Sequence, residues 1–428
     1  MRDMKDSGIE WIGEIPVDWS MKRVKHIFTR KNEKAMQENP TILSLARDGV
    51  KVRDISNNEG QIAESYYNYN PVEEGDLLLN PMDLYSGANC SISKVQGVIS
   101  PAYINLKANA GVNPDFYDYY FKVQYWLMAF FSYGKGVSYD NRWTLSAETL
   151  MNYPVVSLSY DEQCKRADYL DRKCSQIDAI IARQQEVIEK LKAYKLSVIT
   201  EAVTKGLNPN VPMKDSGIDF IGSIPEAWQI CRLRNIGTLQ NGISKGGEFF
   251  GHGFPFVSYG DVYRNLSLPV QVAGLIDSSY EERRNYSVEA GDIFFTRTSE
   301  TIEEVGFSSV CEETIPDATF AGFLIRVRPF TDDLVSKFAK YYFRSNHHRY
   351  YLVKQMNLVT RASLGQDLLK SMPVLVPPKD EQISIAAYLD EKCGAIESSI
   401  EYKQRVIELL TAYKKSLIYE VVTGKKEV

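Results

Sequence analysis

The sequence predicts two similar globular domains of mixed α/β (α+β) structure, joined by two long antiparallel α-helices that form an intramolecular coiled coil. The first observation is a repeat, because residues 4–19 return 209 residues later as residues 213–228. The second is a longer repeat: residues 161–204 return as residues 380–423, with 24 of 44 positions identical. The segments between these repeats barely match. This constant, variable, constant order, occurring twice, indicates two modules of one design related by a pseudo-twofold axis.

Length and composition fit this organisation. A chain of 428 residues exceeds one ordinary hydrophobic core, and 44% hydrophobic residues supply enough apolar material for two. The first residues are charged where a signal peptide needs an apolar run, and no apolar segment approaches the roughly 18 residues of a membrane helix. We therefore expect a cytoplasmic protein that does not enter a membrane.

Cysteine usage and net charge exclude several classes of site. Six cysteines without a Cys-x-x-Cys pair, and only four histidines, indicate neither a disulfide framework nor a metal site. Cys174 and Cys393 are equivalent in the repeat and are expected on an apolar helix face. The net charge of -5 does not by itself indicate a nucleic-acid-binding protein. Any DNA-binding face must therefore come from local clusters of Lys and Arg, or from partner subunits.

The repeats divide the chain into four predicted parts. These are a first domain at 1–160, a first long helix at 161–207, a second domain at 208–379 and a second long helix at 380–428. The segment Asn208-Pro209-Asn210-Val211-Pro212 predicts a short turn or linker after the first helix.

Both variable segments predict mixed α/β modules with a shared framework. Residues 75–80 align with residues 291–296 as a turn followed by a short buried strand. Residues 116–121 and 338–343 predict aromatic helices. The two segments share this framework, but the loops and strand ends that we call their tips differ. This is typical of two modules of one fold that recognise different ligands.

From Asp161 onward, apolar residues follow alternating steps of three and four, the seam of a coiled coil. About 40 residues without Gly or Pro predict a helix of roughly 60 Å. Such a helix needs a second helix against which to bury its apolar face. The second repeated helix in the same chain is the simplest packing partner. The alternative is that the two helices are core helices of two separate domains. Polar seam positions at Gln184 and Lys195, copied as Lys403 and Lys414, are expected to fix register. The predicted seam comprises Leu170, Ile177, Ile181, Ile188 and Leu191 with Leu389, Ile396, Ile400, Ile407 and Leu410.

Several tips carry side chains suited to reading DNA. Residues 296–299, directly after a strand, offer an arginine for guanine or phosphate, and Asn80 at the matching place offers an amide for adenine. Glycine-rich loops at 134–142 and 241–247 carry cations and permit close backbone approach. The alternative is that these loops are ordinary solvated loops, and that the aligned Arg142 and Arg361 make structural salt bridges. The candidate DNA contacts are Asn80, Lys135, Tyr139, Asn141, Arg142, Ser244, Lys245, Thr296, Arg297, Ser299 and Arg361.

The sequence carries no pattern for catalysis. Residues 80–83, Asn-Pro-Met-Asp, lack the aromatic residue of the Asn-Pro-Pro-aromatic motif with which amino-methyltransferases stack a flipped base. Neither a P-loop nor a Gly-x-Ser-x-Gly motif occurs, and the histidines form no nuclease or triad pattern. We expect no catalytic residue, no metal and no bound cofactor in this chain.

The repeated Asp-Ser-Gly-Ile-x-(Trp/Phe)-Ile-Gly-x-Ile-Pro-x-x-Trp opening, residues 75–83 with 99–103, and the Asp-Glu-Gln helix starts at 161 and 380 resemble the specificity subunit of type I restriction-modification enzymes. The resemblance covers essentially the whole chain. It implies a non-catalytic subunit with two target-recognition domains, each reading one half of a bipartite, asymmetric sequence in double-stranded DNA. It also implies that the helices set the half-site spacing and dock two methyltransferase (modification) subunits that methylate adenine.

The resemblance further implies endonuclease/translocase (restriction) subunits as partners, in a bacterial or archaeal cell. S-adenosylmethionine, ATP and Mg²⁺ would then be bound by the partner subunits. It carries no residue-level DNA contacts into the variable segments. Two alternatives stay open: a coiled-coil scaffold or adaptor without sequence-specific DNA binding, and a stand-alone DNA methyltransferase. Binding to random duplexes only at low salt would favour the scaffold, and binding of S-adenosylmethionine by the isolated chain would favour the methyltransferase.

Overall fold

The computed structural model describes residues 2–54, 63, 65–82, 84–85, 89–136, 143–299, 305–355 and 362–428. The chain forms two compact units. Unit 1 consists of Met1–Gln184 and Arg405–Val428, and unit 2 consists of Gln185–Gln404. Each unit therefore contains one globular module and a part of each long helix, whereas the predicted four-part division separates modules from helices. In the part of the chain that the structure describes, no helix has an apolar stretch long enough to cross a membrane.

The two long helices are α5 (Tyr160–Lys205) and α11 (Lys379–Val422), and both begin within one residue of the predicted starts. Both end earlier than predicted, since the expected limits were 207 and 428. A glycine in the left-handed conformation follows each helix. Gly206, with φ of 75°, comes directly after α5, and Gly424, with φ of 78°, comes two residues after the end of α11. Glycine at this position terminates helices because it adopts this conformation without a steric penalty.

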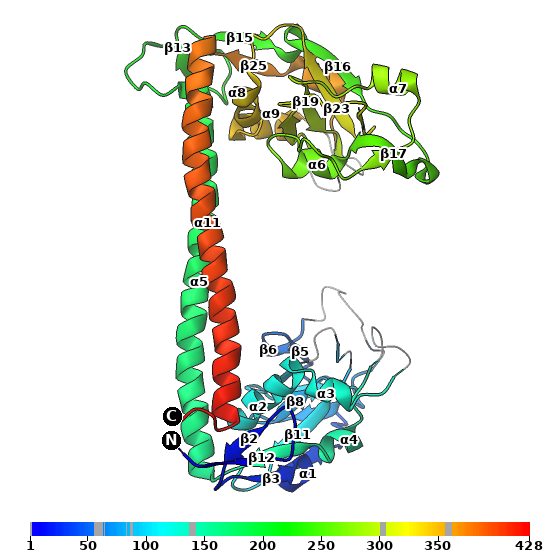
Figure 1. Cartoon of the computed structure of the whole chain (residues 1–428). Coiled ribbons are helices and arrows are strands. Elements are labelled where there is room, and N and C mark those ends of the chain that lie inside the picture. Colours follow the sequence, from blue (N-terminus) through cyan, green and yellow to red (C-terminus); the bar gives the residue numbers. More distant parts are fainter. Residues whose placement is uncertain are drawn as a thin grey trace. The chain divides into compact units, whose positions relative to one another are not determined.

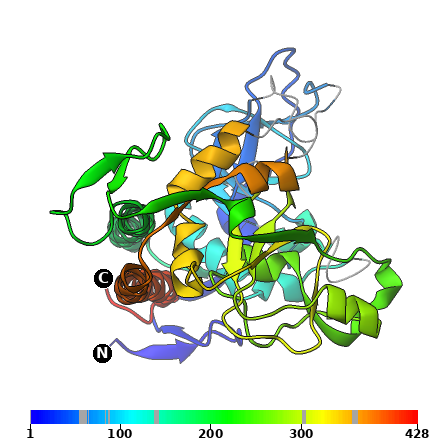
Figure 2. The same ribbon diagram turned by 90° about the horizontal axis from the view of Figure 1, so that it is seen from above.

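Within each unit, the segments of α5 and α11 lie side by side (Figure 1), and Figure 2 shows the pair end-on. In unit 1, Arg166 Nη1 donates to Val421 O over 2.8 Å, and Lys414 pairs with Asp178 at 2.6 Å. Residue numbers rise on one helix as they fall on the other. The pairing is therefore antiparallel, as predicted.

The predicted seam residues face inward. Buried among them are Leu170, Ile177, Ile188, Leu389, Ile396 and Ile407, and half-buried are Ile181, Leu191, Ile400 and Leu410. Two of the four polar seam positions make ion pairs across the helix pair, Lys195 with Glu397 in unit 2 and Lys414 with Asp178 in unit 1. Leu170 also belongs to the core of the unit 1 module, so the helix ends serve as core helices too.

Unit 1 is a mixed module around one antiparallel sheet (Figure 1). Its sheet has the strand order β4 (Phe28–Lys31), β11 (Ile104–Ala108), β8 (Leu77–Leu79) and β9 (Cys90–Ile92). Two-stranded pairs surround it: β1 (Met4–Asp6) with β2 (Glu14–Pro16), β3 (Ser20–Arg23) with β12 (Pro154–Ser157), β5 (Leu43–Ala46) with β6 (Gly49–Val52), and β7 (Asn70–Val72) with β10 (Gly97–Ile99). Its shorter helices are α1 (Val24–Ile27), α2 (Pro114–Trp126), α3 (Ala129–Ser132) and α4 (Ala147–Met151).

Unit 2 repeats this framework and adds strands of its own. Its four-stranded sheet has the order β16 (Gly237–Asn241), β23 (Leu324–Pro329), β19 (Ile293–Thr296) and β21 (Ser308–Val310). Pairs equivalent to those of unit 1 are β13 (Met213–Asp215) with β14 (Ser223–Pro225), and β15 (Gln229–Arg232) with β25 (Pro373–Val376). The added strands are β18 (Leu275–Ile276), β17 (Phe250–Val257) and β22 (Thr319–Phe320) in one sheet, and β20 (Thr298–Ser299) with β24 (Ala362–Ser363) in another. Its shorter helices are η1 (Leu233–Asn235), η2 (Gly247–Phe249), α6 (Tyr259–Arg264), α7 (Tyr280–Asn285), α8 (Ser336–Tyr342), α9 (Asn346–Gln355) and α10 (Gln366–Ser371).

The local sequence accounts for the predicted elements. All three residues of β8 are buried, as expected of a strand covered on both faces. Helix α2 begins with Pro114 after Asn113, whose side chain accepts a hydrogen bond from Asp115 N at 2.9 Å. Aromatic side chains of α2 and α8, among them Phe116 and Phe338, pack in the two main cores. The aromatic helices predicted at 116–121 and 338–343 are therefore confirmed.

Candidate nucleic-acid interface

The opening repeat is fastened to the start of the long helix by the same contacts in both units. The buried Trp at the end of the opening donates its indole N–H to the Glu of the Asp-Glu-Gln helix start. The Gln that follows this Glu accepts a hydrogen bond from the backbone N–H of the N-cap residue of the aromatic helix, α2 or α8. The equivalent bonds are Trp19–Glu162 (3.1 Å) with Trp228–Glu381 (2.9 Å), Asn113–Gln163 (2.8 Å) with Val335–Gln382 (2.8 Å), and Tyr119–Asp171 (2.7 Å) with Tyr341–Asp390 (2.7 Å). The two constant repeats thus form one rigid frame on which each variable segment is mounted.

In unit 2, two of the predicted DNA-reading segments meet at a turn that the sequence did not single out. Gly322 N donates to Ile243 O at 2.7 Å, and Arg297 N donates to Phe323 O at 2.9 Å. Leu364 N donates to Arg297 O at 2.7 Å. The loop after β16 and the end of β19 are therefore brought together around residues 321–323, and the Phe323 side chain between them is 64% exposed. We call this group, with Ser244, Arg297 and Phe323, the unit 2 tip.

The cation of the loop after β16 is used inside the protein. Lys245 Nζ pairs with Glu282 at 2.8 Å, donates to Asp277 O at 2.8 Å and lies 5.0 Å from the ring centre of Phe249. Hydrogen bonding to Lys245 lowers the pKa of Glu282 below its usual range. Lys245 therefore holds this loop to α7, while its neighbour Ser244 is exposed at the unit 2 tip.

The strand end at 296–299 is only partly at the surface. Thr296 is fully buried, and its hydroxyl accepts a hydrogen bond from Phe307 N at 2.9 Å, so it leaves the set of candidate DNA contacts. Arg297 is half-exposed. The backbone of Ser299 pairs with Ala362 between β20 and β24. Arg361 lies outside the described residues.

Unit 1 presents a related arrangement. Asn80 follows β8, and its side-chain oxygen accepts a hydrogen bond from Met82 N at 3.0 Å, which shapes the turn. Leu145 N donates to Pro81 O at 2.8 Å, at the place where Leu364 bonds to Arg297 in unit 2. Lys135 is exposed and pairs with Thr144 through its backbone. The candidates Tyr139, Asn141 and Arg142 lie outside the described residues.

Known proteins share similarity with this chain. Residues 225–406 match the family model of the type I restriction modification DNA specificity domain. Over these residues the chain is similar to that specificity domain, and over most of its length it is similar to type I specificity subunits.

Two curated relatives and two solved structures are similar to the chain over most of its length. The MjaVIII specificity subunit of Methanocaldococcus jannaschii is 22% identical over 97% of this chain and 94% of its own length. The StySPI specificity subunit of Salmonella potsdam is 21% identical over 81% of this chain and 70% of its own length. A chain from a structural study of complex assembly in a type I restriction-modification system has a TM-score of 0.72, with 15% identity over 96% of this chain and 99% of its own length. The HsdS subunit from Thermoanaerobacter tengcongensis has a TM-score of 0.50, with 14% identity over 96% of this chain and 98% of its own length. These likenesses establish the fold.

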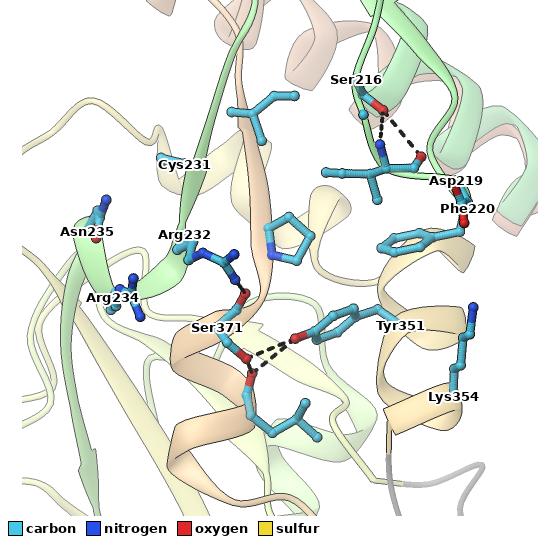
Figure 3. Close-up of a pocket in the computed structure, with 15 residues that line it drawn as sticks. Ser216, Asp219, Phe220, Cys231, Arg232, Arg234, Asn235, Tyr351, Lys354 and Ser371 are labelled. Atoms are coloured by element: carbon cyan, nitrogen blue, oxygen red, sulfur yellow. Dashed lines mark hydrogen bonds between the residues drawn. The ribbon is translucent and has the colours of Figure 1, made fainter.

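Unit 2 contains a basic groove beside the opening repeat (Figure 3). The groove has a volume of about 810 Å³ and lies between residues 216–220, β15 and α9. Arg232, Arg234 and Lys354 line it, with Asp219 as the acidic residue, and Arg232 is held by a 2.9 Å hydrogen bond to Ser371 O. A chain of net negative charge thus has a local cluster of cations, as the sequence required of any DNA-binding face.

Unit 1 has an equivalent groove of about 640 Å³, lined by Lys22, Arg23 and His26. Arg23 corresponds to Arg232 in the repeat. The sequence did not single out these cations, because they lie outside the glycine-rich loops and strand ends where the DNA contacts were expected.

Two half-buried arginines of unit 2 make contacts within the module. Arg328 pairs with Asp292 at 2.6 Å, and Arg344 donates to backbone oxygens that include Ser308 O at 2.6 Å. Burial lowers the pKa of Arg344 to about 10. These contacts hold both side chains to other parts of unit 2.

Proposed function

We propose that this chain is the DNA specificity subunit of a type I restriction-modification complex, in which each unit reads one half of a bipartite, asymmetric site in double-stranded DNA. The observation that carries the proposal is the repetition of one frame under different tips. The bonds from Trp19 to Glu162 and from Trp228 to Glu381 are the same, while the tips around Asn80 and Arg297 differ. Two modules of one fold with different tips suit two different half-sites.

The proposed reading of DNA uses the tips for bases and the cations for phosphates. The arginine of the unit 2 tip, Arg297, has the donor geometry for two acceptors of guanine, and the exposed Phe323 and Ser244 offer apolar and hydroxyl contacts. The basic grooves beside each opening repeat suit phosphates, which position a protein without reading sequence. Asn80 and Lys135 take the corresponding part in unit 1.

The proposed partners supply the chemistry. Two modification subunits would methylate adenine, and restriction subunits would cleave unmodified DNA. S-adenosylmethionine, ATP and Mg²⁺ would be bound by those subunits, as the resemblance to the specificity subunits implies. The continuous helices α5 and α11 would set the separation between half-sites, since their length is fixed at 1.5 Å per residue.

An exchange of variable segments tests this proposal. Residues 28–150 would be replaced by the corresponding segment of another type I specificity subunit, and modified bases would be mapped in a host that supplies the partner subunits. We expect one half-site to change while the other half-site and the spacing stay the same. A change in both half-sites would refute the modular reading. Loss of sequence preference, with binding to random duplexes only at low salt, would favour the scaffold.

A further inference from the structure

One turn of the shared framework carries different side chains in the two units. In unit 2, between β22 and β23, Leu324 N donates to Ala321 O at 2.9 Å. In unit 1, between β10 and β11, Tyr103 N donates to Ser100 O at 3.0 Å. With β8 aligned to β19, β11 pairs in the same register as β23, so the two turns occupy equivalent places. The two turns can therefore be compared residue by residue.

Phe323 in unit 2 stands at the place of Ala102 in unit 1. Both residues are exposed, and Phe323 is 64% exposed. Beside them, at the end of the neighbouring strand, unit 2 has the half-exposed Arg297 and unit 1 has the buried Pro81. Unit 2 thus presents a phenyl ring next to a guanidinium, where unit 1 presents a single methyl group.

The backbone that carries Phe323 is held from both sides. Gly322 N donates to Ile243 O at 2.7 Å. On the other side, Phe323 O accepts a hydrogen bond from Arg297 N at 2.9 Å. Gly242 lets the loop after β16 come this close, because a Cβ atom there would overlap with backbone oxygens of the turn. Phe323 is therefore presented on a preorganised turn, which reduces the entropy lost on binding.

Arg297 and Phe323 are the last opposed pair of their two strands. The preceding pair, Thr296 with Leu324, is fully buried. Because side chains alternate along a strand, Arg297 and Phe323 project from the other face, with Cβ atoms about 5 Å apart. Successive base pairs of DNA are about 3.4 Å apart. Two side chains at this separation can therefore reach neighbouring base pairs.

Both side chains are available to a ligand. Among the described residues, no ion pair or hydrogen bond engages the guanidinium of Arg297, and no aromatic ring stacks on Phe323. Arg326 and Arg328 of the same sheet, in contrast, donate to Ser287 O at 2.6 and 3.0 Å. A single exposed apolar side chain is common on protein surfaces, but this one lies directly beside an unengaged arginine. The pair suits a ligand that offers hydrogen-bond acceptors next to an apolar group.

We propose that Phe323 contacts the C5-methyl group of a thymine in the base pair next to a guanine that Arg297 binds. In the major groove, guanine offers two acceptors to arginine, and thymine carries a methyl group that phenylalanine can contact. The half-site read by unit 2 therefore contains thymine directly beside guanine. Pro81 and Ala102 offer no such pair, so the half-site of unit 1 carries no such requirement at the matching place. This inference rests on the proposed function, in which the tips read bases.

The test compares thymine with deoxyuridine, which lacks the methyl group. The chain in complex with its modification subunits would be titrated with duplexes of the mapped site, in which each thymine of the unit 2 half-site is replaced in turn. That half-site is the one that stays when residues 28–150 are exchanged. We expect one replacement, directly beside guanine, to weaken binding about fourfold, as the loss of one buried methyl group does. Phe323→Ala should bind the thymine and deoxyuridine duplexes equally, and unit 2 should stay folded because this side chain is exposed.

Phe330→Ala is the matched control. Phe330 is 61% exposed and directly follows the other end of β23, so this variant is expected to keep the fourfold preference for thymine. Equal binding of all the duplexes by the wild-type chain, or a fourfold preference that persists in Phe323→Ala, would overturn the inference and leave the proposed function standing. A wild-type complex without any preferred bipartite site would overturn both.

Discussion

Replacement of Glu162 by Gln is expected to destabilise unit 1. The carboxylate accepts hydrogen bonds from Arg2 at 2.6 Å, from Trp19 at 3.1 Å and from Arg166, 2% exposed, at 2.9 Å. Burial raises the pKa of Glu162, but these hydrogen bonds outweigh burial and lower it from 4.5 to about 2. A shift of this size corresponds to at most about 3 kcal/mol. Because the side chain is 19% exposed, solvent screening reduces the expected cost to about 2 kcal/mol.

The contribution of Glu162 to the free energy of unfolding depends on pH as expected for a carboxylate whose pKa is lowered in the folded protein. The stabilisation is fully present above about pH 4.5, where the unfolded chain is ionised, and it disappears as the pH falls toward 2. The stabilities of the wild-type chain and of Glu162→Gln should therefore be compared at pH 7.

Glu381→Gln is the matched control within the same chain. Glu381 accepts a hydrogen bond from Trp228 at 2.9 Å, as Glu162 does from Trp19. Ile385 stands at the place of Arg166, so Glu381 has no arginine at that position. The expected cost of Glu381→Gln is therefore below about 1 kcal/mol.

Hydrogen exchange of the full-length chain resolves the two units. Arg166 also donates to Val421 O at 2.8 Å and to Lys426 O at 2.9 Å, so amides at 420–428 report on the unit 1 network. We expect Glu162→Gln to reduce their protection about 30-fold. Glu381→Gln is expected to reduce protection at 201–210 less than about fivefold. Equal losses in the two variants, or no loss in Glu162→Gln, would refute the reasoning.

Three further predictions follow from the described contacts. Burial lowers the pKa of His348 to about 3, so unit 2 should be fully stable above about pH 6.5 and lose about 2 kcal/mol by pH 5; His348→Gln should remove this difference in denaturant titrations. Arg297→Ala should relax one base position of one half-site in methylation maps, with unit 2 still folded; an unchanged map would contradict a base contact. Deleting one helical turn from both α5 and α11 should change the spacing and keep the half-site bases, and altered bases at the old spacing would contradict a spacer role.

The framework shared by the two units was predictable because local sequence patterns specify it, and these patterns occur twice in the chain. The steps of three and four from Leu170 onward identify the helices, and the agreement between residues 75–80 and 291–296 identifies equivalent strands. The helix ends were wrong by a few residues, since glycines at 206 and 424 stop the helices although the apolar pattern continues up to them.

The candidate interface was less predictable, because it depends on contacts between residues far apart in the chain. Lys245 pairs with Glu282, and Thr296 bonds to the backbone of Phe307, and neither partner is visible in a local pattern. The exposed Phe323 became a candidate only when the fold placed it between Ser244 and Arg297. Gly322, directly before Phe323, is the sequence feature that could have indicated a turn at this place.

Mapping of modified bases on genomic DNA tests the central claim most directly. A host would express this chain with its modification subunits, and the same host without this chain would serve as control. The account predicts methylated adenines within one bipartite sequence, with two different half-sites at a fixed spacing, and none of these marks in the control. Methylation in one continuous sequence, or the same marks without this chain, would contradict it.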